Sequence, residues 1–368
     1  MTGLRWPIMG TIRFDIAELA LPAAPGAAGW PDFETANAVR NTVETEAYGS
    51  ADLALTAEEI LPGWLNQSWD RRRLFVARIA GRVVARGHYE TLPEDSADHA
   101  WLAVEVLPDY RRQGIGTALF ERLEAIAHTE GRRVQIVYTP SPDGPGERLP
   151  SPTGFGSVPL SNPEVRFLRG RGYLLEQVVR ASRLARPVDQ AELRRLRAEA
   201  AFHAGPDYSV LQWVDRTPSE WLSDLALLNT RMSTDAPSAG LAEPEQLWTS
   251  ERILQEEQKA AAGPRTTLTS AVLHGPSGHL VGFTQLEVPA ESRRAVSQED
   301  TLVLWEHRGR RLGMLLKAAS LELLATERPG HPSVMTFNAE ENRHMLTVNE
   351  SIGFAPLGYE GAWRRDAD

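Results

Sequence analysis

The sequence predicts an α/β fold in which one succession of helices and strands occurs twice. The chain has 368 residues, which exceeds the size of one typical hydrophobic core. Some segments of the chain have apolar residues at the spacing of a helix, and others have them at every second position, as in a strand. The order of the resulting elements repeats in the second half, as expected for two copies of one structural unit. We therefore predict two domains, residues 1–185 and 186–368.

Turn residues and caps delimit the elements of the first half. Thr56 and Glu59 have the spacing of a capping box, which opens a helix. Ala80 and Gly81 form the tight turn of a hairpin. The predicted elements are a strand at 11–16, helices at 33–48 and after Thr56, strands at 74–79, 82–90 and 100–107, a helix at 117–129, a strand at 135–139, a short helix in 162–173 and a strand at 174–184. Residues 140–163 are rich in Pro, Gly and Ser, so we predict a loop without regular structure.

The second half is predicted to follow the same order after an amphipathic linker helix at 189–201. Asn338 is expected to cap the last helix, which Gly353 closes. The predicted elements are a strand at 210–214, helical stretches at 218–232 and 244–259, strands at 267–273, 279–288 and 301–304, a helix at 314–326, a strand at 333–337, a helix at 338–351 and a strand from Phe354.

Composition excludes several classes of function. A formal net charge of -10 argues against a general nucleic-acid binder and is compatible with an amine substrate. The chain has 0 Cys, which excludes disulfides and thiolate metal sites. The histidines lack ligand spacing, so we expect no metal. We find no run of about 18 apolar residues and no signal-peptide pattern, so we expect no membrane partner and a cytoplasmic location.

One stretch, residues 104–119, carries the clearest chemical signal. A strand leads into an arginine- and glycine-rich turn, and a helix follows directly. The unpaired N–H groups and the positive dipole end of such a helix form an anion site suited to a phosphate or pyrophosphate. Arg111 and Arg112 add fixed positive charge beside it.

The spacing Arg111-x-x-Gly114-x-Gly116, after a strand ending at Val106-x-Pro108, resembles the coenzyme A signature of the GNAT N-acetyltransferases. Residues 162–173, 301–317 and 338–354 also resemble GNAT sequences, the last matching the closing helix and Gly-Phe turn of the family. Because the layout occurs twice, the chain resembles the tandem GNAT acetyltransferases of actinobacterial type, with a mycothiol synthase-like layout.

This resemblance implies two GNAT modules, each with a mixed, mostly antiparallel sheet whose central parallel strand pair splays apart. The co-substrate would be acetyl-CoA, with no metal, and the acceptor would be the amine of a small molecule, bound by a monomer or homodimer. The pantetheine arm would pair with free backbone in the gap between the splayed strands. The expected coenzyme-binding residues are Val104, Val106, Arg111, Arg112, Gln113, Gly114, Ile115, Gly116, Thr117 and Asn162.

The second half offers a further candidate coenzyme site with one departure from the pattern. Aligning Arg308 with Arg111 places Arg311 at the position of Gly114, while Gly313 keeps the place of Gly116. The Arg311 side chain would either crowd the pyrophosphate or clamp it. The candidate residues are Val303, Arg308, Arg310, Arg311, Leu312, Gly313, Asn338 and Asn342.

Catalytic groups are less clearly marked. Many GNAT enzymes have a tyrosine acid four residues before the Gly-aromatic turn, where this chain has Leu168 and Asn349. Glu105 is the first candidate for a general base; the alternative is that it faces solvent or neutralises Arg111 or Arg112. Further base candidates are His88 and Glu90 in the first half, and Glu287, Asp300, Glu306 and His307 in the second.

Two functions from different classes therefore remain. The first is an enzyme that transfers acetyl from acetyl-CoA to a primary amine in a ternary complex. The second is an acyl-CoA-binding regulatory protein without turnover, which the missing tyrosines and Arg311 favour. In a third arrangement the halves associate through their sheets, and the C-terminal half serves as a scaffold.

Overall fold

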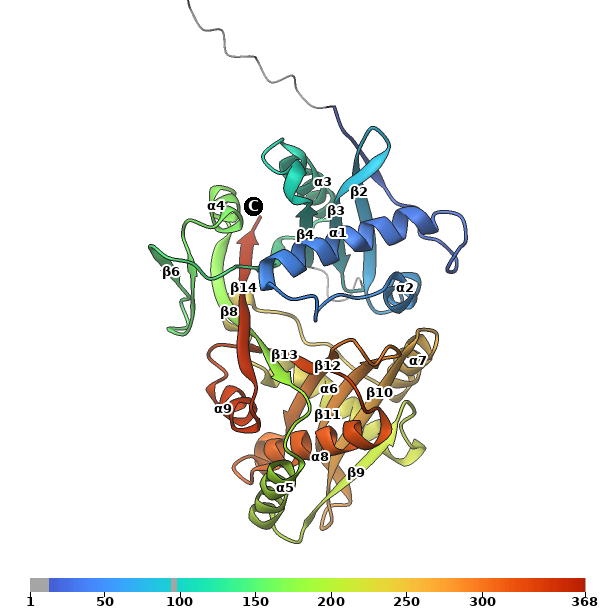
Figure 1. Cartoon of the computed structure of the whole chain (residues 1–368), viewed down its shortest axis with the longest axis vertical. Coiled ribbons are helices and arrows are strands. Elements are labelled where there is room, and N and C mark those ends of the chain that lie inside the picture. The colour runs from blue at the N-terminus through green and yellow to red at the C-terminus, as the bar shows by residue number, and fades with distance from the viewer. Residues whose placement is uncertain (1–12, 94–97, 368) are drawn as a thin grey trace, which may run out of the picture.

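The computed structural model describes residues 13–93 and 98–367. It shows two helix-flanked halves that share one sheet (Figure 1). The sheet has 12 strands in the order β1-β2-β3-β4-β5-β14-β8-β13-β12-β11-β10-β9. Neighbouring strands are antiparallel except for β4 with β5 and β12 with β13, which are parallel. The predicted α/β class, with mostly antiparallel strands and a parallel pair in each half, is confirmed.

The first half contains a capping box at the predicted place. The Thr56 side chain accepts from the Glu59 N–H, and the Glu59 carboxylate accepts from the Thr56 N–H, at the start of α2. The elements are β1 (Asp15–Glu18), α1 (Trp30–Tyr48), α2 (Ala57–Leu65), β2 (Arg71–Ile79), β3 (Arg82–Thr91), β4 (His99–Val106), α3 (Ile115–Thr129), β5 (Val134–Pro140), β6 (Arg148–Pro150), β7 (Ser157–Pro159), α4 (Pro163–Gly170) and β8 (Leu174–Ala185).

The second half repeats this order after the additional helix α5, whose N-cap is Asp189. The Asp189 carboxylate accepts from the N–H groups of Ala191 and Glu192. The elements are α5 (Gln190–Ala204), β9 (Tyr208–Val214), α6 (Leu222–Asp235), α7 (Ser250–Ala261), β10 (Arg265–His274), β11 (His279–Pro289), β12 (Val296–Val303), α8 (Leu312–Glu327), β13 (Ser333–Ala339), α9 (Arg343–Ile352) and β14 (Ala355–Asp366).

The last strand of each half pairs with the other half. Strand β14 lies between β5 and β8, with Gly361 opposite Thr139 on one side and Val178 on the other. Strand β8 in turn pairs with β13 from Val179 to Ala185. In Figure 1, β14 (red) and β8 (green) run side by side at the junction of the halves. Trp363 of β14 is fully buried in the core beneath α3, so the C-terminal strand completes the first-half core.

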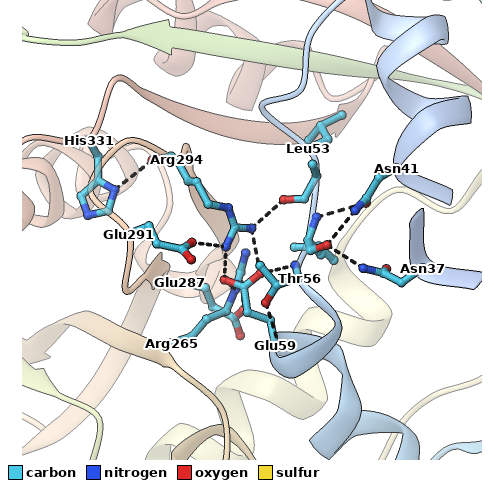
Figure 2. Close-up of polar contacts among 12 residues, drawn as sticks. Asn37, Asn41, Leu53, Thr56, Glu59, Arg265, Glu287, Glu291, Arg294 and His331 are labelled. Atoms are coloured by element: carbon cyan, nitrogen blue, oxygen red, sulfur yellow. Dashed lines mark hydrogen bonds and ion pairs between the residues drawn. The ribbon is translucent and has the colours of Figure 1, made fainter. Parts of the chain in front are cut away.

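Polar contacts also hold the segment between α1 and α2 against the second half (Figure 2). The buried Glu59 carboxylate accepts from both terminal nitrogens of Arg294, at 2.6 and 2.7 Å. A nitrogen of Arg265 lies 3.2 Å from the same carboxylate. Arg294 also donates to the carbonyl of Ala54 at 2.7 Å. Two arginines of the second half thus converge on one carboxylate of the first half.

Three expectations about secondary structure were wrong. Residues 140–163 contain a small antiparallel hairpin, β6 with β7, in which Val158 is buried. Asn342, not Asn338, caps α9, because its carboxamide accepts from the Met345 N–H. Helix α7 begins at Ser250, with Thr249 as its N-cap, so residues 244–249 are not helical. The first strand begins at Asp15, and residues 11–12 of its prediction lie outside the described residues.

Within the described part of the chain, no helix is both long enough and apolar enough to cross a membrane. In the same residues, no group of three or more His, Cys, Asp or Glu side chains is placed to hold a metal ion.

Candidate functional site

The parallel strands β4 and β5 separate as predicted. They pair over His99–Trp101, opposite Val134–Ile136, and diverge from Leu102 onward. On its other side β4 stays paired with β3 as far as Val106. Val104 and Val106 therefore lie on the stretch of β4 that has left β5, where backbone groups can pair with a bound chain.

The turn after β4 ends in an open helix N-terminus. Gly114 is the N-cap of α3 with a φ of 83°, a conformation that glycine adopts at little cost. In the described part of the chain, no side chain caps this helix, and a Cβ added at Gly114 would meet no atom within 4 Å. Gly116 packs against β4, because a Cβ there would lie 3.3 Å from the Val106 side chain. The first-turn N–H groups of α3 are thus accessible to an anion.

Some side chains of the turn form hydrogen bonds that stabilise its conformation, and others are exposed to solvent. The Arg111 Nε donates to the Val106 carbonyl at 3.0 Å, and its terminal nitrogens donate to Glu46. The Gln113 amide donates to the Asp109 carbonyl at 3.2 Å. Arg112 and Thr117 are exposed, whereas Ile115 is buried and presents only backbone. Asn162 donates to the Ser141 hydroxyl and the Pro142 carbonyl, so it braces the chain after β5.

Glu105 is paired with Arg86 on β3, rather than with Arg111 or Arg112. Its two oxygens accept from Arg86 Nε at 3.0 Å and from a terminal nitrogen at 3.1 Å. Both side chains are mostly buried. This ion pair fixes the carboxylate beside the diverging part of β4.

Further ionisable groups, which no sequence pattern marks, gather around Glu105. Glu44 on α1 contacts Arg40 at 2.7 Å through one oxygen, and its other oxygen is buried with no hydrogen-bond partner among the described residues. Burial, with the neighbouring charges of Glu105 and Glu360, raises the pKa of Glu44 to about 7 despite Arg40. Arg40 and Glu44 have the spacing of an ordinary surface pair on a helix, which concealed their burial.

Glu360 reaches this cluster from the C-terminal strand. Its carboxylate accepts from the Tyr48 hydroxyl at 2.6 Å, and burial raises its pKa. Tyr138 on β5 donates to Glu243 of the second half at 2.8 Å, and the Trp101 indole donates to the same oxygen at 3.3 Å. The second half therefore contributes acidic groups to the β4–β5 gap.

The weaker base candidates of the first half are engaged elsewhere. Burial tends to raise the pKa of Glu90, but His88 and Arg72 outweigh it and lower this pKa to about 2. His88 lies 3.3 Å from Glu90 and packs against the Trp64 ring. A carboxylate with so low a pKa is a poor proton acceptor at neutral pH.

The second half repeats the turn with nearly the same backbone. Arg308 Nε donates to the Val303 carbonyl at 3.0 Å, as Arg111 does to Val106. Arg311 is the N-cap of α8 with a φ of 58°, in the left-handed region occupied by Gly114 in the first half. Its guanidinium lies 4.0 Å from Glu199 on α5. Strands β12 and β13 pair over Val296–Ser297 and then separate.

The other predicted second-half residues have varied surroundings. The Arg310 guanidinium lies over the Tyr208 ring, whose hydroxyl is hydrogen-bonded to His307 Nδ1 at 2.8 Å. His307 also packs against His274, consistent with a turn residue. Leu312 and Gly313 are buried in the first turn of α8. Asn338 accepts from the Asn349 amide at 2.7 Å.

Arg311 provides a test of this backbone geometry. A side chain in the left-handed region costs about 1 kcal/mol relative to glycine. We expect Arg311→Gly to raise the free energy of unfolding by about 1 kcal/mol in urea denaturation. Arg112→Gly should behave similarly, since Arg112 has a φ of 63°. A loss of stability in both variants would contradict the shared turn conformation.

Comparisons with known proteins agree with this architecture. Residues 42–143 match the acetyltransferase (GNAT) family model, a range that includes β4, the Gly114 turn and α3. No curated protein matches the sequence.

Solved structures resemble the whole chain. A tandem GNAT protein from the clavulanic acid biosynthesis pathway, solved without acetyl-CoA, is 22% identical with a TM-score of 0.71, over 97% of this chain and 99% of that one. A GCN5-related N-acetyltransferase from Sphaerobacter thermophilus is 15% identical with a TM-score of 0.60, over 96% and 95%. The N-myristoyltransferase of Saccharomyces cerevisiae, with myristoyl-CoA, is 10% identical with a TM-score of 0.55, over 98% and 80%. The chain therefore has a tandem GNAT fold, with a GNAT acetyltransferase match at residues 42–143.

Proposed function

We propose that this protein transfers an acetyl group from acetyl-CoA to a primary amine of a small molecule, in a ternary complex, and that its first half binds the coenzyme. The observation that carries the proposal is the open N-terminus of α3 at the end of a strand that has left its parallel neighbour. The GNAT match over residues 42–143 supports acyl transfer as the general chemistry.

The geometry of the turn fits a diphosphate. The N–H groups from Gly114 to Thr117 point out of the helix end, where the dipole adds about half a positive charge. Arg112 lies exposed beside them, while Arg111 holds the turn against Val106. Backbone groups of Val104 and Val106 that face away from β3 would bind the pantetheine arm, apart from the Val106 carbonyl, which accepts from Arg111.

Glu105 and Glu44 are the residues of this half that we assign to proton handling. Arg86 holds Glu105 beside the gap, where its carboxylate receives a proton from the acceptor amine, directly or through water. Glu44, with a pKa of about 7 and one unpartnered oxygen, takes up that proton in turn. Leu168 is in the core, so it supplies no acid.

The alternative, coenzyme binding without turnover, has one specific observation in its favour. Both oxygens of Glu105 already accept hydrogen bonds from Arg86, so this carboxylate has a structural partner that a purely binding protein would also need. In that case the protein would respond to acyl-CoA without consuming it.

Thermal stabilisation by acetyl-CoA, followed by thiol release on a panel of primary amines, tests the proposal. Gly114→Glu puts a carboxylate at the diphosphate position and should weaken acetyl-CoA binding by about 30-fold, equal to about 2 kcal/mol. The neutral variant Gly114→Asn, which tolerates the left-handed backbone, is the matched control. Glu105→Gln should retain binding and lose thiol release. Binding without release on any amine would favour the regulatory alternative, and no binding would refute both.

A further inference from the structure

The second half contains a cavity of about 300 Å³ at the point where β12 and β13 separate. Strand β12 contributes its residues 297–301 and β13 its residues 335–338. Leu53 of the first half and Met232 of α6 contribute apolar surface. The volume is at the lower end of the range for small-molecule sites.

Two carboxylates line this cavity from an irregular part of β12. Thr301 pairs with Thr284, but Gln298 pairs with Leu286, so β12 has one extra residue in the bulge that contains Glu299 and Asp300. The corresponding pairing of β3 with β4 runs from Ala85 to Glu90 without a shift. The bulge is therefore a feature of the second half.

Neither carboxylate has an ion-pair partner among the described residues. Both residues are partly accessible and line the cavity, and nearby protein atoms shield their carboxylates from water. Burial, with the charges of Glu287 and Asp300, raises the pKa of Glu299 to about 8 although Arg265 opposes this. Burial also raises the pKa of Asp300. Two neighbouring acidic groups without an ion-pair partner among the described residues favour a cation at this side of the cavity.

Lys317 of α8 lines the same cavity, and its burial is a second unusual feature of the site. It is 1% exposed, and the described residues offer it no hydrogen bond or ion pair. Its ammonium nitrogen lies 5.8 Å from the centre of the Phe354 ring. The equivalent position in the first half is Phe120, a core residue that packs on Tyr173. A lysine has thus replaced an apolar residue where burial of an unpaired amine is costly.

We propose that this cavity is a binding site for a small zwitterion, with the ligand's ammonium group at Glu299 and Asp300 and its carboxylate at Lys317. An alkylamine would leave Lys317 without a partner, and a simple carboxylate would meet Glu299 and Asp300. A ligand with both charges satisfies all three groups. Lys317 forms no ion pair with the cavity's carboxylates in the described part of the chain, and burial lowers its pKa to about 7. The site needs no coenzyme and is separate from the acetyl transfer proposed above.

Calorimetric titration with three matched probes tests this proposal without acetyl-CoA. The probes are 4-aminobutyrate, butylamine and butyrate, and glycine and 6-aminohexanoate vary the charge separation. We expect one of the three zwitterions to bind at least tenfold more tightly than butylamine and butyrate. If none exceeds both single-charge probes, the proposal is wrong, whatever the outcome for acetyl-CoA.

Two variants and a spectroscopic signal separate the contribution of Lys317 from that of Glu299 and Asp300. In Lys317→Met, the zwitterion should no longer bind more tightly than butylamine. In the double variant Glu299→Gln with Asp300→Asn, it should no longer bind more tightly than butyrate. Lys259→Met, which alters a lysine paired with Glu256, is the control. Because the chain has lysine only at 259 and 317, ¹³C-lysine labelling gives two signals. The bound zwitterion should raise the titration midpoint of Lys317 alone; an unchanged midpoint would overturn the proposal.

Discussion

Replacing Glu59 with glutamine is expected to lower the free energy of unfolding by about 3 kcal/mol, because it removes the buried carboxylate that Arg294 and Arg265 share and leaves them only their outer partners Glu291 and Glu287. The Glu59 side chain is only 1% exposed, and it receives Arg294 at 2.6 Å and Arg265 at 3.2 Å. The substitution retains the size of the side chain, so the loss reports the charge. Urea denaturation measures it.

The neighbouring Glu58 provides the control for this variant. It is exposed in the same first turn of α2, so Glu58→Gln should change stability by less than about 0.5 kcal/mol. Burial favours a higher pKa for Glu59, but hydrogen bonds from Arg294 and Thr56 and the charge of Arg265 hold this pKa below its usual value. The contribution is therefore present above the ordinary pKa of a glutamate and is lost as the pH falls through the native pKa. Equal effects of the two variants would contradict the arrangement in Figure 2.

Lys317→Met is expected to stabilise the protein by about 4 kcal/mol at pH 7. The structure buries this amine completely, which lowers its pKa to about 7, whereas an unfolded chain has an ordinary lysine. Between these two pKa values the unfolded state holds a proton that the native state lacks. The stability of the unaltered protein should therefore rise as the pH increases from about 7 to about 10.

Denaturation curves recorded across that pH range measure this effect. The contribution of Lys317 to the rise should disappear in Lys317→Met and persist in Lys259→Met. Methionine has a similar length and no charge to desolvate, so cavity formation does not obscure the comparison. If Lys317→Met destabilises the protein at pH 7, the lysine has a stabilising partner, and the burial of an unpaired amine is contradicted.

Local patterns allowed much of the fold to be predicted. The Thr56–Glu59 capping box, the hairpin at Ala80–Gly81 and the turn at Gly114 depend on residues close together in the sequence, and the structure has each of them. The cap of α9 was misplaced because Asn338 and Asn342 are both good N-caps, and the extended β13 continues past Asn338. The β6–β7 hairpin was missed because its strands are short and contain proline.

Contacts between distant parts of the chain could not be predicted. The pairing of β14 with β5, and of β8 with β13, depends on which edges meet after both halves have formed. Glu44 gains its raised pKa from burial and from the charges of Glu105 and Glu360, which lie on different strands. Glu105 was identified from its place before the turn, but its partner Arg86 lies on the neighbouring strand β3, which only the sheet pairing brings beside it.

Hydrogen exchange of the backbone amides, with and without acetyl-CoA, tests most directly whether the N-terminus of α3 binds the diphosphate. We expect acetyl-CoA to slow exchange at the first-turn amides from Gly114 to Thr117 and along the diverging part of β4. Unchanged exchange at these amides in the presence of saturating acetyl-CoA, or slowing confined to the equivalent turn at Arg311, would contradict this expectation.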